Sequence, residues 1–374
     1  MKIKSFEFNL SELAGSTGDF GTLFPLAIGY IALCGLDSAG FLVIMGLANI
    51  VTGIVYRLPM PIEPMKVLAV VAIAQHWSPS MVYASAFSMG IIWLIFAVTG
   101  IIRWLARITP ESVIRGIQVA LGLLLALEAF KMISTWWAVG LFSIIIVLML
   151  RRNRYAPAAL MLLVFGAAIM FARGNFQQLS PPEFRLPSLT LFTPAEVWQT
   201  LILAGFAQVP LTITNATIST SSLIKKYWPD KTVSERKLSF NQGIMNLVSS
   251  FFGGMPMCHG AGGLAGQYYF GARTGGANII EGLIEVSMGL FFSASIAVMF
   301  SFFPMAIIGA MMLLVGIELT MFARDQKFDM DIIPFLLTVI FSLAVNMAWG
   351  FIAGLAVYHF SRYFVSRRKR RDFI

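Results

Sequence analysis

Apolar runs long enough to cross a lipid bilayer recur along almost the whole chain, and they constrain the fold more than any other feature. A helix needs about 20 mostly apolar residues to span the hydrocarbon core. Hydrophobic residues make up 58% of the 374 positions and charged residues only 12%. This composition leaves too little polar surface to solvate a globule of this size. We therefore predict an all-α integral membrane protein without a sizeable soluble domain.

About fourteen apolar segments lie between loop signals, and two of them are too short to cross the membrane unaided. The predicted ranges are 20–36, 39–56, 64–76, 80–102, 112–129, 134–150, 156–172, 197–222, 238–252, 260–271, 278–299, 304–320, 331–347 and 349–365. The two short segments are 64–76 and 260–271. We expect these to be half-helices that meet near the middle of the membrane.

Lysine and arginine residues test this division independently, because the cytoplasmic loops of membrane proteins carry an excess of them. With the N-terminus in the cytoplasm, nearly all of the 27 basic residues fall on the cytoplasmic side. The exceptions are Lys131, Arg173 and Arg185 outside, and Lys66 within a segment. The bias predicts an even number of spans in the plasma (inner) membrane, with both termini cytoplasmic. Nucleic-acid binding is excluded, because no soluble basic face exists to carry it.

The chain contains a weak internal repeat. GLANIVTGIVYRLPMP at 46–61 aligns with GIMNLVSSFFGGMPMC at 243–258, so that Asn49 meets Asn246. Each half would hold about seven spans, and an odd number requires the second half to enter the membrane with opposite orientation. We predict two inverted repeats, at residues 1–180 and 195–374.

Proline- and glycine-rich stretches precede both short segments. They are LPMPIEP at 58–64 and GGMPMCHGAGG at 253–263. Such backbone is tolerated at membrane depth where it is buried or lines a cavity. Pro64 suits the first turn of one helix, and the other is expected to begin near Gly260. Facing helix N-termini would offer N–H donors and partial positive charge to an anion; alternatively, these residues merely kink or pack membrane helices.

Two charged residues accompany the first of these stretches. Lys66 is expected one turn into the helix, and a buried ammonium needs a carboxylate partner or an anionic substrate. Its partner could be Glu63, in which case the pair is structural. Glu63 could instead carry a coupling proton, or satisfy donors at a helix N-terminus. The sequence leaves these alternatives open.

Further polar residues flank Pro25 and Pro210, which stand at equivalent places in the two predicted halves. They are Asp19 and Thr22 in STGDFGT, and Gln208, Thr212, Thr214 and Asn215 in AQVPLTITN. Uncharged donors beside a helix interruption suit the orientation of an oxyanion, although Ser and Thr in helices also bond the preceding turn. For Glu128, Glu281, Glu285 and Glu318 we favour hydrogen bonds between helices. His259 beside Cys258 is too small a set for a metal site, so no metal or other cofactor is expected.

Four stretches resemble signature segments of the molybdate transporter family, relatives of the SulP sulfate permeases. They are ELAGSTGDFGTLFP, PMPIEPMKVLAVVAIA, QVPLTITNATIS and MPMCHGAGGLAGQYYFGARTGG. The resemblance implies the seven-plus-seven inverted-repeat fold shared with uracil permease. In that fold spans 1–4 and 8–11 form a core domain, spans 5–7 and 12–14 form a gate domain, and the substrate lies between spans 3 and 10.

The resemblance transfers a substrate-binding role to most of the residues singled out above. With the neighbouring motif residues included, the predicted site comprises Asp19, Thr22, Glu63, Pro64, Lys66, Gln208, Thr212, Asn215, His259, Gly260, Ala261 and Gly262. Two features depart from the wider pattern. The chain stops at RRKRRDFI, where SulP permeases usually continue into a regulatory domain, and Glu63 stands where glutamine is expected. The glutamate favours proton coupling over simple anion coordination.

The expected function is secondary active uptake of molybdate or sulfate with protons, by movement of the core against the gate. The expected partners are the oxyanion, protons and the lipid bilayer, and a homodimer is left open. Alternatives are a transporter of another small anion or a nucleobase on the same fold, or an anion channel. An enzyme is not expected, because no nucleophile, base and orienting group converge by spacing.

Overall fold

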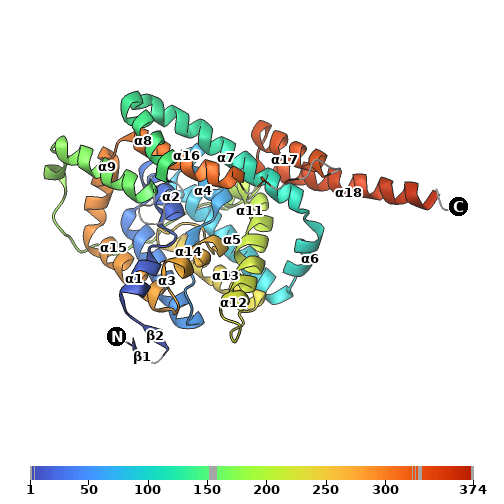
Figure 1. Cartoon of the computed structure of the whole chain (residues 1–374), viewed down its shortest axis with the longest axis horizontal. Helices are drawn as coiled ribbons and strands as arrows, with labels where there is room; N and C mark the ends of the chain where they lie inside the picture. The colour runs from blue at the N-terminus through green and yellow to red at the C-terminus, as the bar shows by residue number, and fades with distance from the viewer. Residues whose placement is uncertain are drawn as a thin grey trace.

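The computed structural model is mostly helical, as the composition predicts, and adds two short antiparallel ribbons that an all-α fold does not contain. It describes residues 2–3, 5–150, 158–321, 323–324, 326 and 331–371, with backbone alone at 2–3, 21–22 and 364–371. Figure 1 shows the helices packed into one body, from which α18 (Met347–Arg371) leads away toward the C-terminus.

The elements of the first half of the chain are β1 (Lys2–Ile3), β2 (Phe6–Glu7), α1 (Leu10–Ser16), α2 (Phe20–Ala32), α3 (Ser38–Tyr56), β3 (Ile62–Pro64), α4 (Lys66–Ala74), α5 (Pro79–Thr99), α6 (Ile102–Ile108), α7 (Glu111–Ile133), η1 (Ser134–Trp136), α8 (Trp137–Leu150), α9 (Ala158–Ala172) and η2 (Asn175–Gln178). Those of the second half, before α18, are α10 (Pro194–Thr200), η3 (Leu201–Gly205), α11 (Phe206–Thr212), η4 (Ile213–Ile218), α12 (Ser219–Tyr227), α13 (Glu235–Phe251), β4 (Met257–His259), α14 (Ala261–Phe270), α15 (Gly276–Phe302), α16 (Met305–Met321) and α17 (Ile332–Ala344).

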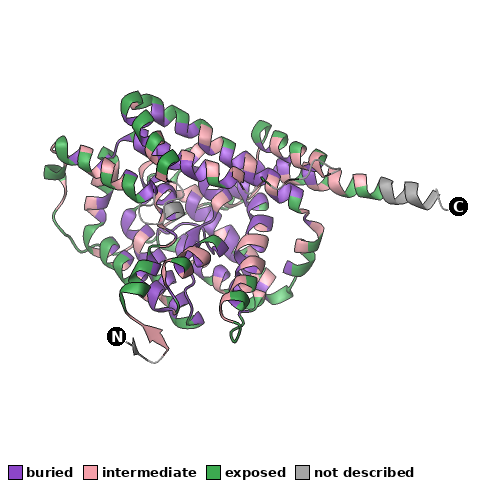
Figure 2. Cartoon of the chain, viewed as in Figure 1, coloured by how far each residue is buried: buried purple, intermediate pink, exposed green. Residues whose placement is uncertain are grey.

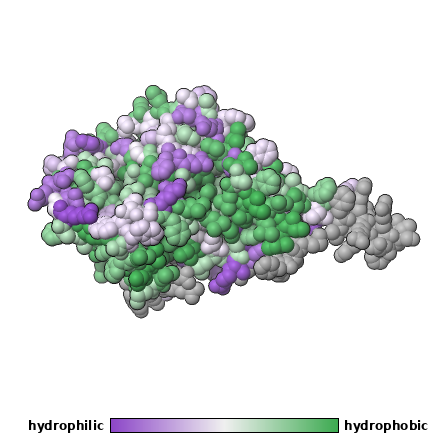
Figure 3. All heavy atoms as spheres, turned by 90° about the horizontal axis from the view of Figure 1, so that it is seen from above, coloured by the Kyte–Doolittle hydropathy of each residue, from purple (hydrophilic) through white to green (hydrophobic). Residues whose placement is uncertain are grey.

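Helices occupy the predicted apolar segments, apart from residues 156–157, which lie outside the described part of the chain. Within the described residues, five helical stretches are long and apolar enough to cross a membrane: 38–56, 79–99, 111–150, 194–227 and 276–302. Large apolar side chains are exposed along them, and Figure 3 shows broad hydrophobic areas on the surface. Exposed apolar surface of this extent fits contact with lipid rather than water. The total of fourteen spans stays a prediction.

The ribbon of β3 and β4 lies in the buried centre of the molecule. The strands are antiparallel, with Ile62 opposite His259 and Pro64 opposite Met257. Each strand leads into a short helix, α4 or α14, so the two helices leave from opposite ends of the ribbon. Figure 2 shows that buried residues are concentrated in this central region. The N-terminal ends of α4 and α14 therefore both face the ribbon.

The ribbon corrects two details of the sequence prediction. Pro64 belongs to β3 and is not in the first turn of a helix, because Met65 still donates its N–H to the carbonyl of Pro256, at 2.9 Å. Lys66 is the first residue of α4 and does not lie one turn inside it. A proline in a two-stranded ribbon can leave its missing N–H on the unpaired side.

Buried asparagine amides hold both strands in place. The side chain of Asn246 accepts from the N–H of Met257 and donates to its carbonyl, at 2.8 and 2.7 Å. Asn278 of α15 likewise accepts from the N–H of Met60, just before β3, and donates to its carbonyl, at 2.6 and 2.7 Å. Asn49, the predicted repeat counterpart of Asn246, accepts from the amide of Asn278. Buried backbone that leaves a helix needs such partners, so these amides specify where each helix is broken.

Pro210 lies inside the helical run from Pro194 to Tyr227. Widened π-helical turns, η3 and η4, flank the α-helical segment that contains it. A proline removes one helical N–H and crowds the preceding turn, and π turns absorb that disturbance. The side chains of Gln208 and Thr212 project from this irregular stretch.

Candidate functional site

The N-terminus of α4 is capped by a side chain from the second half of the chain. The amide oxygen of Gln208 accepts from the N–H of Val67 at 2.7 Å and from that of Leu68 at 3.3 Å. The amide nitrogen of Gln208 donates to the hydroxyl of Thr212 at 2.5 Å. Free N–H groups in the first turn of a helix need such an acceptor when they are buried. A neutral oxygen therefore lies at a position that attracts anions.

The N-terminus of α14 is approached by a carboxylate from the first half. Ideal Cβ atoms at Gly260 and Gly263 would lie 2.2 Å from Cδ and 2.3 Å from Oε1 of Glu63, respectively. The glycines are therefore required by the close approach of this side chain. The same carboxylate pairs with the ammonium of Lys66 at 2.8 Å. The structure thus contains the Glu63–Lys66 pair that the sequence left as one alternative.

Accessible space begins beside this ion pair. Gly262 is exposed, and no atom lies within 4 Å of an ideal Cβ built on it. The side chain of Lys66 is 15% exposed, whereas that of Glu63 is 2% exposed. Lys66 is therefore the more accessible member of the pair.

Three further carboxyl groups are buried near the ribbon. Asp19, at the N-cap of α2, faces Glu281 of α15 within hydrogen-bonding range. Glu281 also accepts from Gln267 at 3.0 Å, and Glu285 accepts from Asn49 at 2.9 Å. The hydrogen bonds between helices that we favoured for Glu281 and Glu285 are confirmed.

The remaining predicted site residues lie on four different elements. Ala261 begins α14, and Asn215 lies half-buried in η4. His259 is buried and packs edge-on against Tyr56, with ring centroids 5.5 Å apart. The backbone of Thr22 lies in α2, and its side chain is outside the described residues.

Comparison with known proteins agrees with the resemblance. Residues 11–125 and 200–319 match the family described as "Molybdate transporter of MFS superfamily". The chain belongs to the molybdate transporter family. Molybdate transporter 2 of Arabidopsis thaliana is 31% identical to this transporter, over 93% of the chain and 86% of the relative. Molybdate transporter 1 of the same plant is 30% identical, over 94% of the chain and 88% of the relative.

The fold of the transporter is shared with a solved structure. The transmembrane domain of the cyanobacterium bicarbonate transporter BicA superposes with a TM-score of 0.68 at 16% identity, covering 92% of this chain and 97% of that domain. Membership of the family and this fold identify an integral membrane protein that transports anions and is not an enzyme. Both matched ranges contain parts of the ribbon site, since β3 lies in the first and β4 in the second.

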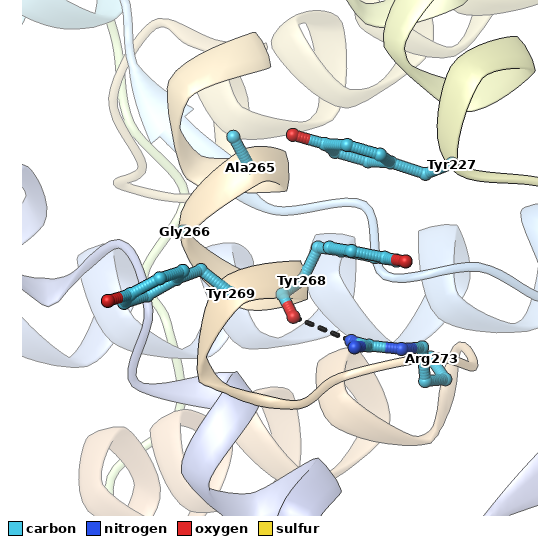
Figure 4. Close-up of a pocket in the computed structure, with 6 residues that line it drawn as sticks. All are labelled: Tyr227, Ala265, Gly266, Tyr268, Tyr269 and Arg273. Carbon is cyan, nitrogen blue, oxygen red and sulfur yellow. Dashed lines mark hydrogen bonds between the residues drawn. The ribbon is translucent and has the colours of Figure 1, made fainter.

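A cavity of about 590 Å³ lies elsewhere on the transporter, along the C-terminal half of α14. Figure 4 shows the ring of Tyr268 between that of Tyr227 and the guanidinium of Arg273. Arg273 already donates to the carbonyls of Tyr268 and Ala272, at 2.6 and 2.7 Å. Its guanidinium is therefore less available to an anion than the ammonium of Lys66.

One buried carboxylate at a helix N-terminus was not singled out from the sequence. Glu12 of α1 accepts from the N–H groups of Arg273, Thr274 and Ala277, and so caps the N-terminus of α15. Burial raises the pKa of Glu12, while these hydrogen bonds act in the opposite direction. The motif ELAGS contains this residue, but its partners are far away in the sequence.

Proposed function

We propose that this transporter takes up molybdate, or sulfate, together with protons, and that the oxyanion binds between the N-termini of α4 and α14. The observation that carries the proposal is the β3–β4 ribbon, which brings both helix ends to one buried place. Lys66 and the exposed Gly262 border that place. A tetrahedral dianion suits a site built from an ammonium and helix N-terminal donors.

The residues would divide the work of binding. Lys66 would exchange part of its contact with Glu63 for the oxyanion, and the backbone at Gly260, Ala261 and Gly262 would approach it without bulky side chains. The amide of Gln208 would turn from capping α4 toward the substrate or would be displaced by it. Pro64 and His259, on the paired strands, would hold the backbone of the site in place.

The proposed mechanism is alternating access. Spans 1–4 and 8–11 would form the core domain, here α2 to α5 and α10 to α15. Spans 5–7 and 12–14 would form the gate, here α7 to α9 and α16 to α18. The ribbon lies entirely within the proposed core, so a bound anion would move with it relative to the gate. Both termini would lie in the cytoplasm and the protein in the plasma (inner) membrane.

Uptake of labelled molybdate into liposomes tests the proposal. An inward proton gradient should drive accumulation by the wild type, and Lys66→Ala combined with Gln208→Ala should abolish it. Lys131→Ala is a matched control, because Lys131 also pairs with a buried glutamate three residues earlier, at 3.0 Å, but its own side chain is 73% exposed. Unaltered uptake by the double variant would remove the assignment of the site.

Competition distinguishes the substrate classes. Tungstate and sulfate in excess should block molybdate binding, and uracil should not. Block by uracil would favour a nucleobase transporter on the same fold. Ohmic current without coupling to protons would favour an anion channel.

A further inference from the structure

The centre of the molecule holds more negative than positive side chains. Asp19, Glu63, Glu281 and Glu285 are all at least nine-tenths buried. Among the described residues, Lys66 is the one lysine or arginine that forms an ion pair with any of these four. Several unpaired carboxylates cannot all stay ionised in a region of low dielectric constant. Some of them must therefore bind a proton or another cation.

Glu63 is the member of the four with a cationic partner, the ammonium of Lys66. Glu285 and Glu281 each accept one amide hydrogen bond, from Asn49 and Gln267, and in each the other oxygen has no donor among the described residues. What distinguishes Glu281 is its neighbour, because the carboxyl group of Asp19 faces it.

The carboxyl groups of Asp19 and Glu281 face each other. No side-chain amide, hydroxyl or ammonium of the described residues donates to either oxygen of Asp19, and Oε1 of Glu281 likewise has no such donor. Oε2 of Glu281 accepts from Gln267. Two carboxylates offer only acceptors, so they can hydrogen-bond to each other only when one of them carries a proton.

We infer that Asp19 and Glu281 share one proton, and that this shared proton is the ion coupled to anion uptake. The inference deepens the proposed function and rests on it. It moves the coupling role away from Glu63, which already has an ion-pair partner in Lys66. It also assigns Asp19 to the proton and not to the oxyanion.

The pair is close enough to the substrate site to sense the charge of the anion. An ideal Cβ on Gly263 would lie 3.2 Å from Cβ of Asp19 and 2.3 Å from Oε1 of Glu63. A dianion near Lys66 is repelled by an ionised pair and tolerated by a protonated one. Anion and proton therefore favour each other's binding, and by linkage the effect is reciprocal.

Other titratable groups face this pair from the surrounding elements, and the test must separate their effects. They are Glu63 of β3, Lys66 of α4 and Glu285 of α15. Cys258 of β4 lies near Lys66, and Glu12 of α1 caps the N-terminus of α15. Glu285 is the best control among them, because it is also buried, lies one helical turn from Glu281 and, like Glu281, accepts one amide hydrogen bond.

The dissociation constant of molybdate, measured on the purified full chain as a function of pH, tests the inference. If one proton binds with each anion, the wild-type constant rises about tenfold per pH unit once the pair has lost its proton. Asp19→Asn and Glu281→Gln should each flatten this dependence, and Glu285→Gln should keep it. The inference would be overturned if both Asp19→Asn and Glu281→Gln kept the slope, or if Glu285→Gln alone lost it. Dependence of molybdate binding on sodium in place of pH would also overturn it.

Infrared spectroscopy supplies a second readout that does not need molybdate. The wild type at neutral pH should show the carbonyl band of a protonated carboxyl group, and Asp19→Asn and Glu281→Gln should each lack it. If one variant fails to fold, the other carries the test. Absence of the band from the wild type would overturn the inference. Presence of the band without molybdate binding at any pH would contradict the proposed function and leave the shared proton in place.

Discussion

The N-termini of α4 and α14 both lie beside the β3–β4 ribbon, but different side chains lie against them. At α4 the amide oxygen of Gln208 accepts from two backbone N–H groups. At α14 the carboxylate of Glu63 lies against Gly260 and Gly263. Gln208 and Glu63 each lie against a helix from the other half of the chain. The two parts of the chain therefore meet at the N-terminal ends of α4 and α14.

The difference between the two ends is one of charge. A helix N-terminus that already holds a carboxylate attracts a further anion less strongly than one capped by a neutral amide. The attraction for a substrate dianion should therefore come from Lys66 and the α4 end. The α14 end contributes its glycines and the open space at Gly262. The two helix ends thus differ in charge, although both lie beside the same ribbon.

Breaking the Glu63–Lys66 ion pair should have the largest effect on stability. Glu63→Gln or Lys66→Met leaves one buried charge unpaired, which costs about 3–5 kcal/mol. The double variant should recover part of that loss. Chemical unfolding of the purified protein measures the three free energies, and strictly additive single effects would show that the pair does not couple the two helix ends.

Filling the space at the α14 end should have the next largest effect. A Cβ at position 260 would lie 2.2 Å from Cδ of Glu63, so Gly260→Ala should destabilise the fold by about 1–3 kcal/mol. Gly262→Ala is the matched control, because nothing lies within 4 Å of its Cβ. Thermal unfolding should separate the two variants. Equal melting temperatures would mean that Glu63 does not lie against Gly260.

Removing the neutral cap should have a smaller effect, and substrate should reverse part of it. Gln208→Ala leaves the N–H groups of Val67 and Leu68 without their acceptor, a loss of about 1 kcal/mol. Because an oxyanion could accept from the same groups, molybdate should stabilise this variant more than the wild type. Equal stabilisation by molybdate would place the anion away from α4.

Changing the carboxylate at a third helix N-terminus, Glu12 at α15, should have the smallest effect. Its pKa is raised by burial, so the native state holds a proton more tightly than the unfolded chain does. Stability from Glu12 is therefore full below the ordinary value of 4.5 and declines as pH rises through the folded value. The wild type should lose stability relative to Glu12→Gln over that window. Parallel pH profiles of thermal unfolding would contradict this.

The breaks in the two short helices could be predicted from the sequence. Proline in LPMPIEP and glycine in GGMPMCHGAGG mark backbone that cannot continue a helix, and α4 and α14 indeed begin just after these stretches. The strands between break and helix were not predicted, because the pairing of Ile62 with His259 depends on contacts between distant parts of the chain. A proline in the sequence signals a break without saying which backbone replaces the helix.

Several residues that stood out in the sequence meet in the fold, but their contacts could not be predicted. Gln208 stood out as a polar residue beside Pro210, but its hydrogen bonds to α4 require the fold. Asp19 was grouped with the substrate because it lies in a signature motif. Its contact with Glu281 joins two segments whose sequences give no sign of each other. Residue type indicates what a side chain can do, and the fold decides which partner it meets.

Locating bound tungstate in an experimental density map tests the central claim most directly, because this tetrahedral anion scatters strongly. The anion should appear between the N-termini of α4 and α14, in contact with Lys66 and near Gly262. Density in the cavity beside Tyr268 and Arg273, with none at the ribbon, would contradict the account.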